Sequence, residues 1–289
     1  MAEIWTILKL LQWTTDFFKR KGIEQARANA EVLLAHVLSM ERVGLYLHYD
    51  QPLSPVELSV YREAVRRRAA REPAQYITQK QEFWSLEFEV NPFVLIPRPE
   101  TELLVAKALE ILPDAPSLAL DLGTGSGAIA VALAHERPRL RLIASDISPP
   151  ALEVAKRNAL RHGVGERIAF VASDLLAAFP PARPSFDLVA SNPPYIGGRE
   201  FEALPPEIAR HEPLGALEGG GVEGLDVARK IIAEAPPYLK PGGWLLMEIG
   251  RAQASLLERE LSESRDFDSY RFFEDFSGIM RLLALERAG

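Results

Sequence analysis

Residues 117–137 read SLALDLGTGSGAIAVALAHER, and this stretch decides the fold of the larger part of the chain. It starts as an apolar strand, turns through Gly123, Gly125 and Gly127, and continues as an apolar helix. Glycines at such a turn let backbone N–H groups approach a ligand at the amino end of the helix. A turn with no ligand is the other interpretation of these residues. The strand and helix that flank the loop favour a binding site.

Apolar strands and helices alternate from Ser117 towards the end of the chain. The expected strands are residues 117–123, 141–146, 167–174, 186–192 and 244–250, and helices are expected at 127–137, 149–163 and 227–243. Residues 270–275 and 279–287 are predicted to close the chain as an antiparallel pair. This alternation predicts an α/β fold in which helices cover both faces of a mostly parallel sheet.

The chain before residue 80 is predicted to be helical. Apolar residues recur at helical spacing from Ile4 to about Ile77, and Ser54-Pro55 is typical of an N-cap followed by proline, opening a helix through Arg71. No catalytic constellation occurs in this part. We expect three parts: a helical domain over 1–79, a β-hairpin linker over 80–98 and an α/β domain over 99–289.

The hairpin is expected from an alternating stretch at residues 83–90 and an apolar run at 93–96, with Asn91-Pro92 as the turn between them. Pro97 and Pro99 then rigidify the chain before a helix that begins near Glu100.

Composition narrows the classes of protein. The 289 residues are 47% hydrophobic and 25% charged, with no cysteine, so disulfides and thiolate metal sites are excluded. The five histidines show no HExxH arrangement, and we expect no metal. Residues 1–22 indicate an amphipathic helix in place of a membrane span, so a cytoplasmic protein without a membrane partner is expected.

Charge gives a weaker indication. The net charge of −7 lowers the expectation of direct nucleic-acid binding. One basic cluster is interpreted first as a solvated face, and second as a docking surface for an acidic or RNA-associated partner. It comprises Arg62, Arg66, Arg67, Arg68 and Arg71.

Acidic residues beside the glycine loop bear on which ligand it binds. Asp146 ends the strand about 20 residues further on, where a carboxylate can hold ribose hydroxyls. Gly123, Gly125 and Ala128 also satisfy a dinucleotide pattern, so a dinucleotide oxidoreductase is one alternative. Asp121 before the loop disfavours it, because a carboxylate there would crowd a pyrophosphate but can help to hold a cationic amino-acid end.

A second motif, Ser191-Asn192-Pro193-Pro194-Tyr195, ends another apolar strand. The side-chain oxygen of Asn192 and the carbonyl of Pro193 can accept both N–H groups of a planar NH2, and proline aims that carbonyl in advance. Tyr195 can pack against the flat group. A proline turn with no chemical role is the alternative, disfavoured because ligands bind at the carboxyl ends of α/β strands.

Taken together, "DLGTGSG", the following aspartate and "SNPPY" resemble the class I S-adenosylmethionine-dependent methyltransferases that act on planar nitrogen. With "REPAQYI", "EFWSLEFEV" and "LIPRPETELLV", nearly the whole chain resembles the protein-(glutamine-N5) methyltransferase family known as PrmC or HemK. The resemblance implies a Rossmann-like seven-stranded methyltransferase sheet with a C-terminal antiparallel pair, preceded by a small all-α domain. It also implies methylation of the Gly-Gly-Gln glutamine of class-1 peptide chain release factors, which supports translation termination and leaves S-adenosyl-L-homocysteine.

The resemblance also implies site residues. Those for catalysis and for the substrate glutamine are Asn192, Pro193, Pro194 and Tyr195, of which Pro194 would act in binding only. Those for S-adenosyl-L-methionine are Gly123, Thr124, Gly125, Ser126, Gly127, Asp146, Asp174, Leu175 and Asn192.

The segment with Arg98, Glu100, Thr101 and Glu102 is expected to border the site, with helix capping and closure of the linker as the alternative. Two positions depart from the family pattern. Leu175 stands where some members carry an aromatic residue, and Gln79 replaces a glycine.

Three other functions stay open. An adenine-N6 methyltransferase acting on DNA or RNA shares the Asn-Pro-Pro-Tyr motif, although a basic face would then be expected. A dinucleotide oxidoreductase and a non-catalytic scaffold are the others. The helical domain is expected to dock the release factor.

Overall fold

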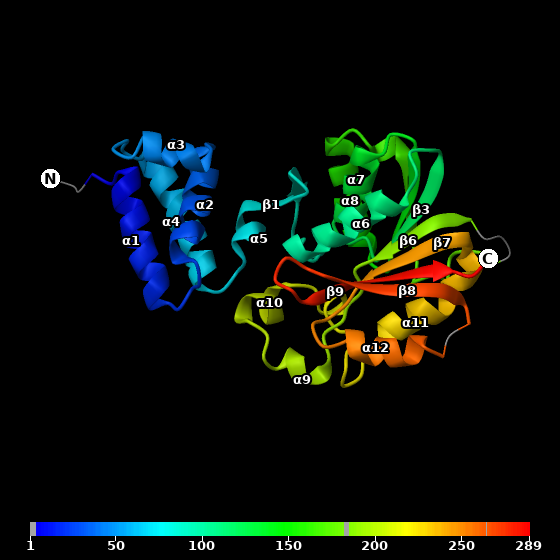
Figure 1. Cartoon of the computed structure of the whole chain (residues 1–289). Helices are drawn as coiled ribbons and strands as arrows, with labels where there is room; N and C mark the ends of the chain where they lie inside the picture. Colours follow the sequence, from blue (N-terminus) through cyan, green and yellow to red (C-terminus); the bar gives the residue numbers. More distant parts are fainter. Residues whose placement is uncertain (1–3, 182–184, 264) are drawn as a thin grey trace. The chain divides into compact units, whose positions relative to one another are not determined.

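The structure is a computed structural model and describes residues 4–181, 185–263 and 265–289 (Figure 1). The chain forms two compact units. Unit 1 comprises the chain through Lys80 together with Pro205–His211, and unit 2 comprises Gln81–Leu204 and Glu212–Gly289. No helix within the described ranges is long and apolar enough to span a membrane.

Unit 1 is all-helical, as predicted. Its helices are α1 Ile7–Arg20, α2 Ala26–Leu38, α3 Arg42–Leu47, α4 Pro55–Ala69, α5 Ala74–Thr78 and α10 Pro206–His211. Apolar side chains one or two helical turns apart, such as Ile7, Leu11 and Phe18 of α1, are fully buried in its core. The predicted start of α4 is confirmed, since Ser54 and Glu57 form a capping box and Pro55 is the first helical residue.

The basic cluster in unit 1 is largely neutralised by ion pairs. Arg66 pairs with Glu63, Arg67 pairs with Glu72, and Arg68 and Arg71 both pair with Glu207 of α10. Arg68 is buried, so the interpretation of the whole cluster as a solvated face is wrong for this residue. Arg68 and Arg71 instead attach α10 to the rest of unit 1.

The hairpin exists, but its predicted position is wrong. Strands β1 Lys80–Phe83 and β2 Leu86–Glu89 form it, the turn is Trp84-Ser85, and residues 93–96 are not a strand. Trp84 and Ser85 both have positive φ, +53° and +55°, which suits a tight hairpin turn but is uncommon without glycine or asparagine. Contacts distant in sequence hold it, because Trp84 donates its backbone N–H to the Glu102 carboxylate at 2.7 Å.

Unit 2 is built on a seven-stranded sheet of order β5-β4-β3-β6-β7-β9-β8. Its strands are β3 Ser117–Leu122, β4 Leu140–Asp146, β5 Ile168–Ala172, β6 Phe186–Ser191, β7 Leu239–Glu248, β8 Phe267–Glu274 and β9 Met280–Arg287. Strands β3 to β7 are parallel, whereas β9 is antiparallel to both β7 and β8. The predicted mixed sheet with its C-terminal antiparallel pair is confirmed.

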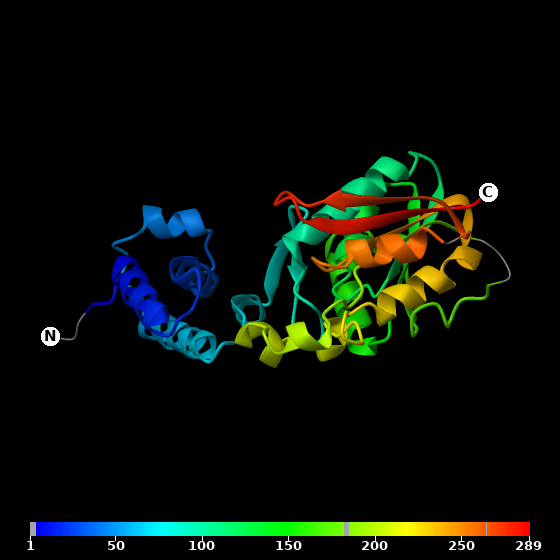
Figure 2. The same ribbon diagram turned by 60° about the horizontal axis from the view of Figure 1, so that its bottom comes forward.

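Helices cover both faces of this sheet (Figures 1 and 2). Helices α6 Glu102–Ile111, α7 Ala128–Glu136 and α8 Pro149–Arg161 lie on one face, and α11 Asp226–Glu234 and α12 Ala254–Leu261 lie on the other. Side chains of β3 alternate between the two faces of the sheet. Ala119 packs in the core beneath α6 and α7, and its neighbour Leu120 packs in the core beneath α11 and α12. The short helix α9 Gly198–Phe201 and helix α12 were not predicted from the sequence.

Strand order places a crevice at one position. Strands β4 and β5 lie on one side of β3, and β6 and β7 lie on the other, so the direction of winding reverses between β3 and β6. Ligands bind outside the carboxyl ends of strands at such a switch point. The glycine loop follows β3 and Asn192 follows β6, so both motifs meet there.

Candidate active site

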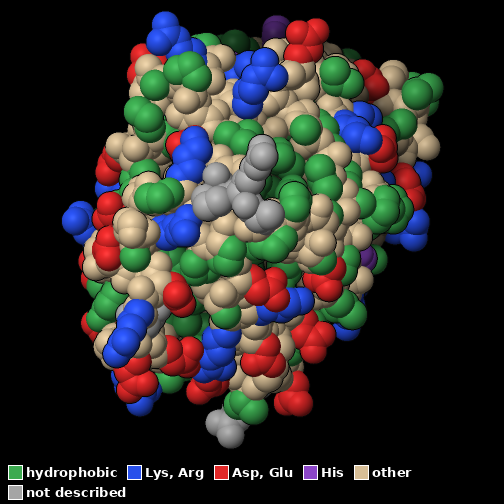
Figure 3. Space-filling model, turned by 90° about the vertical axis from the view of Figure 1, so that its right-hand side faces the viewer, with side chains coloured by type: hydrophobic (Ala, Val, Ile, Leu, Met, Phe, Trp, Pro, Cys, Tyr) green, Lys and Arg blue, Asp and Glu red, His purple; other side chains and the backbone are tan. Residues whose placement is uncertain are grey.

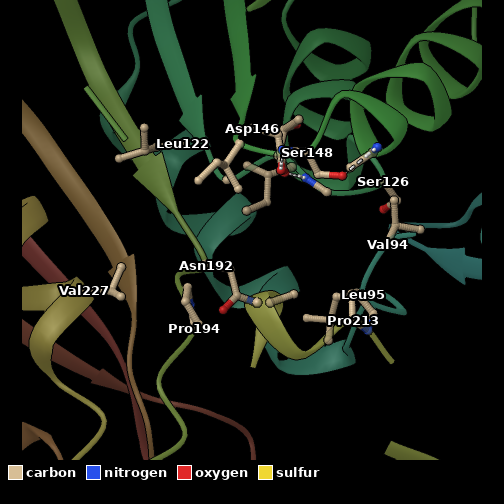
Figure 4. Close-up of a pocket in the computed structure, with 18 of the residues that line it drawn as sticks. Val94, Leu95, Leu122, Ser126, Asp146, Ser148, Asn192, Pro194, Pro213 and Val227 are labelled. Atoms are coloured by element: carbon tan, nitrogen blue, oxygen red, sulfur yellow. Dashed lines mark hydrogen bonds between the residues drawn. The ribbon is translucent and has the colours of Figure 1, made fainter. Parts of the chain in front are cut away.

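A cavity of about 550 Å³ lies at the carboxyl ends of β3 to β6 (Figure 4). This volume is in the range of sites for small molecules and cofactors. Ten of the residues expected at or beside the site line it: Thr101, Gly123, Thr124, Gly125, Ser126, Asp146, Asp174, Leu175, Asn192 and Pro194. Gly127, Pro193 and Tyr195 are not among the lining residues.

The glycine loop leaves open space above its backbone. Gly123 and Gly125 have φ of +76° and +54°, and a Cβ at either position would meet no described atom within 4 Å. Gly127 differs, since a Cβ there would lie 3.0 Å from the Cβ of Ala155 in α8. The first two glycines therefore let a ligand approach the backbone, whereas the third lets α7 and α8 approach each other.

Asp121 holds the loop from below the cavity. It is fully buried, and its Oδ2 accepts from the Thr124 hydroxyl at 2.6 Å and from the Ala130 N–H at 3.0 Å. Its Oδ1 has no hydrogen-bond partner among the described residues. Burial raises the pKa of Asp121 to about 7, against the opposing effect of these two hydrogen bonds.

Asp146 connects the loop to the start of α8. Its Oδ2 accepts from the Gly125 N–H at 2.8 Å, and its Oδ1 accepts from the Ser148 N–H at 2.9 Å. Burial raises the pKa of Asp146, although bonds from backbone N–H groups oppose that shift. Each carboxylate oxygen has a second lone pair, so the side chain can still accept hydrogen bonds from hydroxyl groups of a ligand in the cavity.

Asp174 and Leu175 follow β5 at another edge of the cavity. Asp174 is exposed, and its carboxylate lies 3.9 Å from the Lys230 ammonium, which also lines the cavity. Leu175 has a φ of +48°, which is uncommon for a residue with a branched side chain. The Ser173 hydroxyl donates to the Leu175 carbonyl at 2.7 Å and holds this conformation.

Asn192 lies at the end of β6 with its two amide atoms in different settings (Figure 4). Its Nδ2 donates to the Thr101 hydroxyl at 3.0 Å. Within the described part of the chain, its Oδ1 and the Pro193 carbonyl have no hydrogen-bond partner. Asn192 Oδ1 is therefore available on the cavity wall, and the Pro193 carbonyl, which belongs to a buried residue outside the lining, is a second acceptor next to it in the chain.

Tyr195 is the last residue of this motif and does not line the cavity. Its hydroxyl interacts with the Glu248 carboxylate, and its backbone carbonyl accepts from Gln253 Nε2 at 2.9 Å. Burial and the nearby Glu248 charge raise the pKa of Tyr195 above its ordinary value. The structure therefore places the hydroxyl against a buried carboxylate at the end of β7.

The proline-flanked segment divides its tasks. Thr101 lines the cavity, Glu102 accepts from the hairpin turn, Glu100 is exposed, and Arg98 pairs with the buried carboxylate of Glu212 at 2.5 Å. Of these four residues, the structure brings Thr101 alone to the cavity wall.

Several lining residues were missed in the sequence. They come from the loop before the proline-flanked segment, from the chain after α10 and from α11: Phe93, Val94, Leu95, Pro97, Pro213, Gly215, Ala216, Glu218, Val227 and Lys230. A signal was present for the second group, because residues 212–226 read EPLGALEGGGVEGLD, rich in glycine and without periodicity. Across the described ranges, no group of three or more His, Asp or Glu side chains is placed to hold a metal ion.

Known proteins resemble this chain at several levels. A family model described as the PrmC N-terminal domain matches residues 9–78, and one described as the methyltransferase small domain matches residues 100–210. A release factor glutamine methyltransferase of Geobacter sulfurreducens is 46% identical over 97% of this chain and 96% of its own length. One of Chlorobaculum tepidum is 41% identical over 98% of this chain and 97% of its own.

Solved structures show the same fold at low identity. The hMettl16 catalytic domain in complex with MAT2A 3′UTR hairpin 6 has a TM-score of 0.56 and 19% identity, over 75% of this chain and 80% of that chain. A methyltransferase from Pyrococcus furiosus has a TM-score of 0.51 and 19% identity, over 71% of this chain and 90% of that chain. At these identities the likeness concerns the fold.

Strand order, the ligand crevice and the matched models thus agree on the class I S-adenosylmethionine-dependent methyltransferases. Identities above 40% over nearly full lengths narrow this class. The chain belongs to the family of release factor glutamine methyltransferases.

Proposed function

We propose that this chain transfers a methyl group from S-adenosyl-L-methionine to the side-chain amide nitrogen, N5, of the Gly-Gly-Gln glutamine in class-1 peptide chain release factors. S-adenosyl-L-homocysteine is the second product, and the modification supports translation termination. The observation that carries the proposal is Asn192 Oδ1 on the wall of the glycine-loop cavity, which has no hydrogen-bond partner among the described residues, with the Pro193 carbonyl next to it in the chain. The names of relatives that match nearly the whole chain support the choice of substrate.

The residues of the cavity fit S-adenosyl-L-methionine. The open backbone at Gly123 and Gly125, with Thr124 and Ser126 between and beside them, would hold its amino-acid end. Asp121 would act on this end only through the loop, because it is fully buried outside the cavity lining and binds Thr124 and the Ala130 N–H. Asp146 would accept the ribose hydroxyls, and Asp174 and Leu175 would border the adenine.

The chemistry needs positioning more than it needs a strong base. When bound, the cofactor supplies an electrophilic methyl group on a sulfonium. An amide nitrogen is a poor nucleophile because its lone pair is delocalised, so it must be held in line with that methyl group. Asn192 Oδ1 and the Pro193 carbonyl would each accept one N–H of the glutamine amide and fix its direction. The nitrogen becomes acidic on methylation and releases its proton to water.

Surface charge bears on the rival adenine-N6 activity. On the face drawn in Figure 3, Lys and Arg side chains are interspersed with Asp and Glu in place of a continuous basic surface. That face is at the amino ends of the strands, away from the cavity; the net charge of −7 favours a protein substrate over a nucleic acid. No observation on the cavity favours a dinucleotide oxidoreductase over the methyltransferase.

The division of labour is part of the proposal. Residues 1–79 would dock the release factor, residues 80–98 would join the two functions, and residues 99–289 would carry out transfer in the cytoplasm. Unit 1 supports a docking role because the large apolar side chains Val43 and Leu47 of α3 are well exposed on it.

The test mixes the purified chain with methyl-labelled S-adenosyl-L-methionine and a class-1 release factor. A parallel reaction contains the release factor with its Gly-Gly-Gln glutamine changed to alanine, and a third contains adenine-rich nucleic acid. Label in the intact factor alone is the expected result. Label in the nucleic acid and in neither protein would overturn the proposal and favour an adenine clamp.

A further inference from the structure

We infer that Thr101 and Glu248 are positioning residues that decide which end of the Asn192 amide faces the substrate. This inference rests on the proposed function, and it assigns a task to two residues outside the Asn-Pro-Pro-Tyr motif. The two are 147 positions apart, at the 3-10 turn Pro99–Thr101 before α6 and at the end of β7.

The observation is a continuous chain of hydrogen bonds. Asn192 Nδ2 donates to Thr101 Oγ1 at 3.0 Å, and Thr101 Oγ1 donates to Glu248 Oε2 at 2.6 Å. Thr101 and Glu248 are 4% and 3% exposed, so water does not compete for these bonds. The Tyr195 hydroxyl meets the same carboxylate.

The donor and acceptor in each of these hydrogen bonds follow from the Glu248 carboxylate. An ionised carboxylate only accepts, so the Thr101 hydroxyl gives its proton to Glu248 and offers its oxygen lone pair to Asn192. That lone pair selects the NH2 end of the Asn192 amide. The carbonyl end must then face away from Thr101, where it is available to a substrate N–H.

Shape alone cannot make this choice. The oxygen and the NH2 group of an asparagine amide are nearly equal in size, so rotating the amide by half a turn costs little unless hydrogen bonds distinguish the ends. A rotated Asn192 would present N–H groups to the N–H groups of a substrate amide and would repel it. We call Asn192 Oδ1 and the Pro193 carbonyl, the two acceptors for the substrate amide, the clamp. Thr101 and Glu248 therefore decide that Asn192 turns its oxygen, and not its NH2 group, toward the substrate.

The anchor is itself rigid. Glu248 is the last residue of β7 and pairs with Leu282 of β9, in the middle of the mixed sheet. Thr101 is held by the proline-flanked segment, whose Arg98 is paired with buried Glu212. The end of β7 and the proline-flanked segment thus both contribute to holding the Asn192 amide. This gives Thr101 a role at its place in the proline-flanked segment.

The experiment uses the full chain and compares Thr101→Val, Thr101→Ser, Glu248→Gln and the double variant Thr101→Val/Glu248→Gln. The control is Ser117→Ala, which removes a buried hydroxyl bonded to Ala115 at the amino end of β3, outside the cavity lining. For each variant we would measure kcat and KM on a class-1 release factor, the affinity for S-adenosyl-L-homocysteine, and thermal unfolding.

We expect Thr101→Val to lower kcat about ten- to a hundred-fold through misorientation of the clamp. Thr101→Ser and Ser117→Ala should stay within about threefold of the unchanged chain, and the affinity for S-adenosyl-L-homocysteine should be unaltered throughout. Glu248→Gln should lower kcat less than Thr101→Val, because a glutamine amide can still accept from Thr101. Since both residues act through one chain of bonds, the double variant should be no slower than Thr101→Val.

Three results would overturn the inference: a Thr101→Val variant with unchanged kcat, a Thr101→Ser variant as slow as Thr101→Val, or a loss of product affinity that equals the loss of kcat. Unfolding that explains the loss in Thr101→Val leaves Glu248→Gln to decide, and an unchanged kcat there would also overturn it. These outcomes leave the proposed function intact as long as the unchanged chain methylates the factor. Failure of the unchanged chain to do so would instead contradict the proposed function.

Discussion

Asn192 is the residue of the cavity whose side-chain amide has two separate roles, one for each of its polar atoms. Its Nδ2 donates to the Thr101 hydroxyl, and its Oδ1 has no partner among the residues that the structure describes. Replacing Asn192 with alanine removes one of the two acceptors for the substrate amide. We predict that Asn192→Ala lowers kcat at least about a hundred-fold, because the nucleophile loses its alignment.

The same variant should keep its affinity for S-adenosyl-L-homocysteine within a few-fold, because the glycine loop and Asp146 are unchanged. Titration calorimetry and single-turnover transfer to a release factor measure the two quantities. A variant that still transfers at the original rate would show that Asn192 does not hold the substrate.

Glu248 predicts a dependence of kcat on pH. Burial raises its pKa to about 7, opposed by the Thr101 and Tyr195 hydroxyls and by Arg281, and assisted by the charge of Glu100. The clamp needs the ionised form, so kcat should rise as pH increases through about 7. This rise should disappear in Glu248→Gln. Asp121 has a similarly raised pKa in both proteins, so the difference between their two profiles is the informative quantity.

The contribution of Glu248 to the free energy of unfolding should change with pH in the opposite direction to kcat. The pKa of Glu248 is higher in the folded chain than its ordinary value of 4.5, so the native state binds the proton more tightly than the unfolded state does. Its contribution to the free energy of unfolding is present below about 4.5 and is lost as pH rises through about 7. Between pH 4.5 and 7, the unfolding temperature should decline less for Glu248→Gln than for the unchanged chain.

Gln79 tests the one departure from the family pattern that has a backbone explanation. It ends α5 with a φ of +58°, a left-handed conformation that favours glycine. Gln79→Gly should raise the free energy of unfolding of unit 1 by about 0.5 to 1 kcal/mol, the gain in the folded state exceeding the cost in the unfolded chain.

Urea unfolding would measure this gain, with Gln75→Gly inside the same helix as the matched control. The control should lose about 1 kcal/mol, since its residue is helical. A loss at both positions would contradict the explanation.

Among the elements, the glycine loop and α7 depend on Gly127 in a different way from Gly123 and Gly125. A Cβ at Gly127 would lie 3.0 Å from the Ala155 Cβ and 3.2 Å from its Cα, and its φ is +82°. Gly127→Ala should therefore force α7 and α8 apart and lower the stability of unit 2 by about 1 to 3 kcal/mol.

Gly215→Ala is the control for this element. It also adds one methyl group, but the added Cβ meets no described atom within 4 Å. Its free energy of unfolding should stay within about 0.5 kcal/mol of the original. Equal losses in both variants would contradict the packing role of Gly127.

The elements also show what sequence can and cannot predict. Strands β3 to β7 are predictable because each contains a short apolar run, and the parallel order expected for such runs already brings Gly123 and Asn192 to the same edge of the sheet. The hairpin turn is misplaced by sequence reasoning because Trp84 and Ser85 adopt positive φ under contacts with distant residues such as Glu102. The link from Thr101 to Glu248 has no local signal, since it joins residues 147 positions apart.

At the level of the whole molecule, unit 1 should determine affinity for an intact release factor. Val43 and Leu47 of α3 lie one helical turn apart and are 64% and 71% exposed. Changing both to aspartate should raise KM for the full-length factor about tenfold, a loss of about 1.4 kcal/mol. KM for a short Gly-Gly-Gln peptide should not change, because the peptide lacks the rest of the factor that would contact α3.

Val56 and Val60 of α4 provide the comparison, since they are also exposed and one turn apart. The same double change to aspartate there separates a specific docking surface on α3 from a general effect of added charge. Equal effects of the two pairs, or an equal effect on the peptide, would contradict docking through α3.

The most direct test of the central claim is the position of the transferred methyl group. A class-1 release factor would be treated with S-adenosyl-L-methionine and either the unchanged chain or Asn192→Ala, digested, and fragmented in a mass spectrometer. The account predicts one methyl group on the side-chain amide nitrogen of the Gly-Gly-Gln glutamine with the unchanged chain, and almost none with Asn192→Ala. A methyl group on any other residue, or equal modification by both proteins, would contradict it.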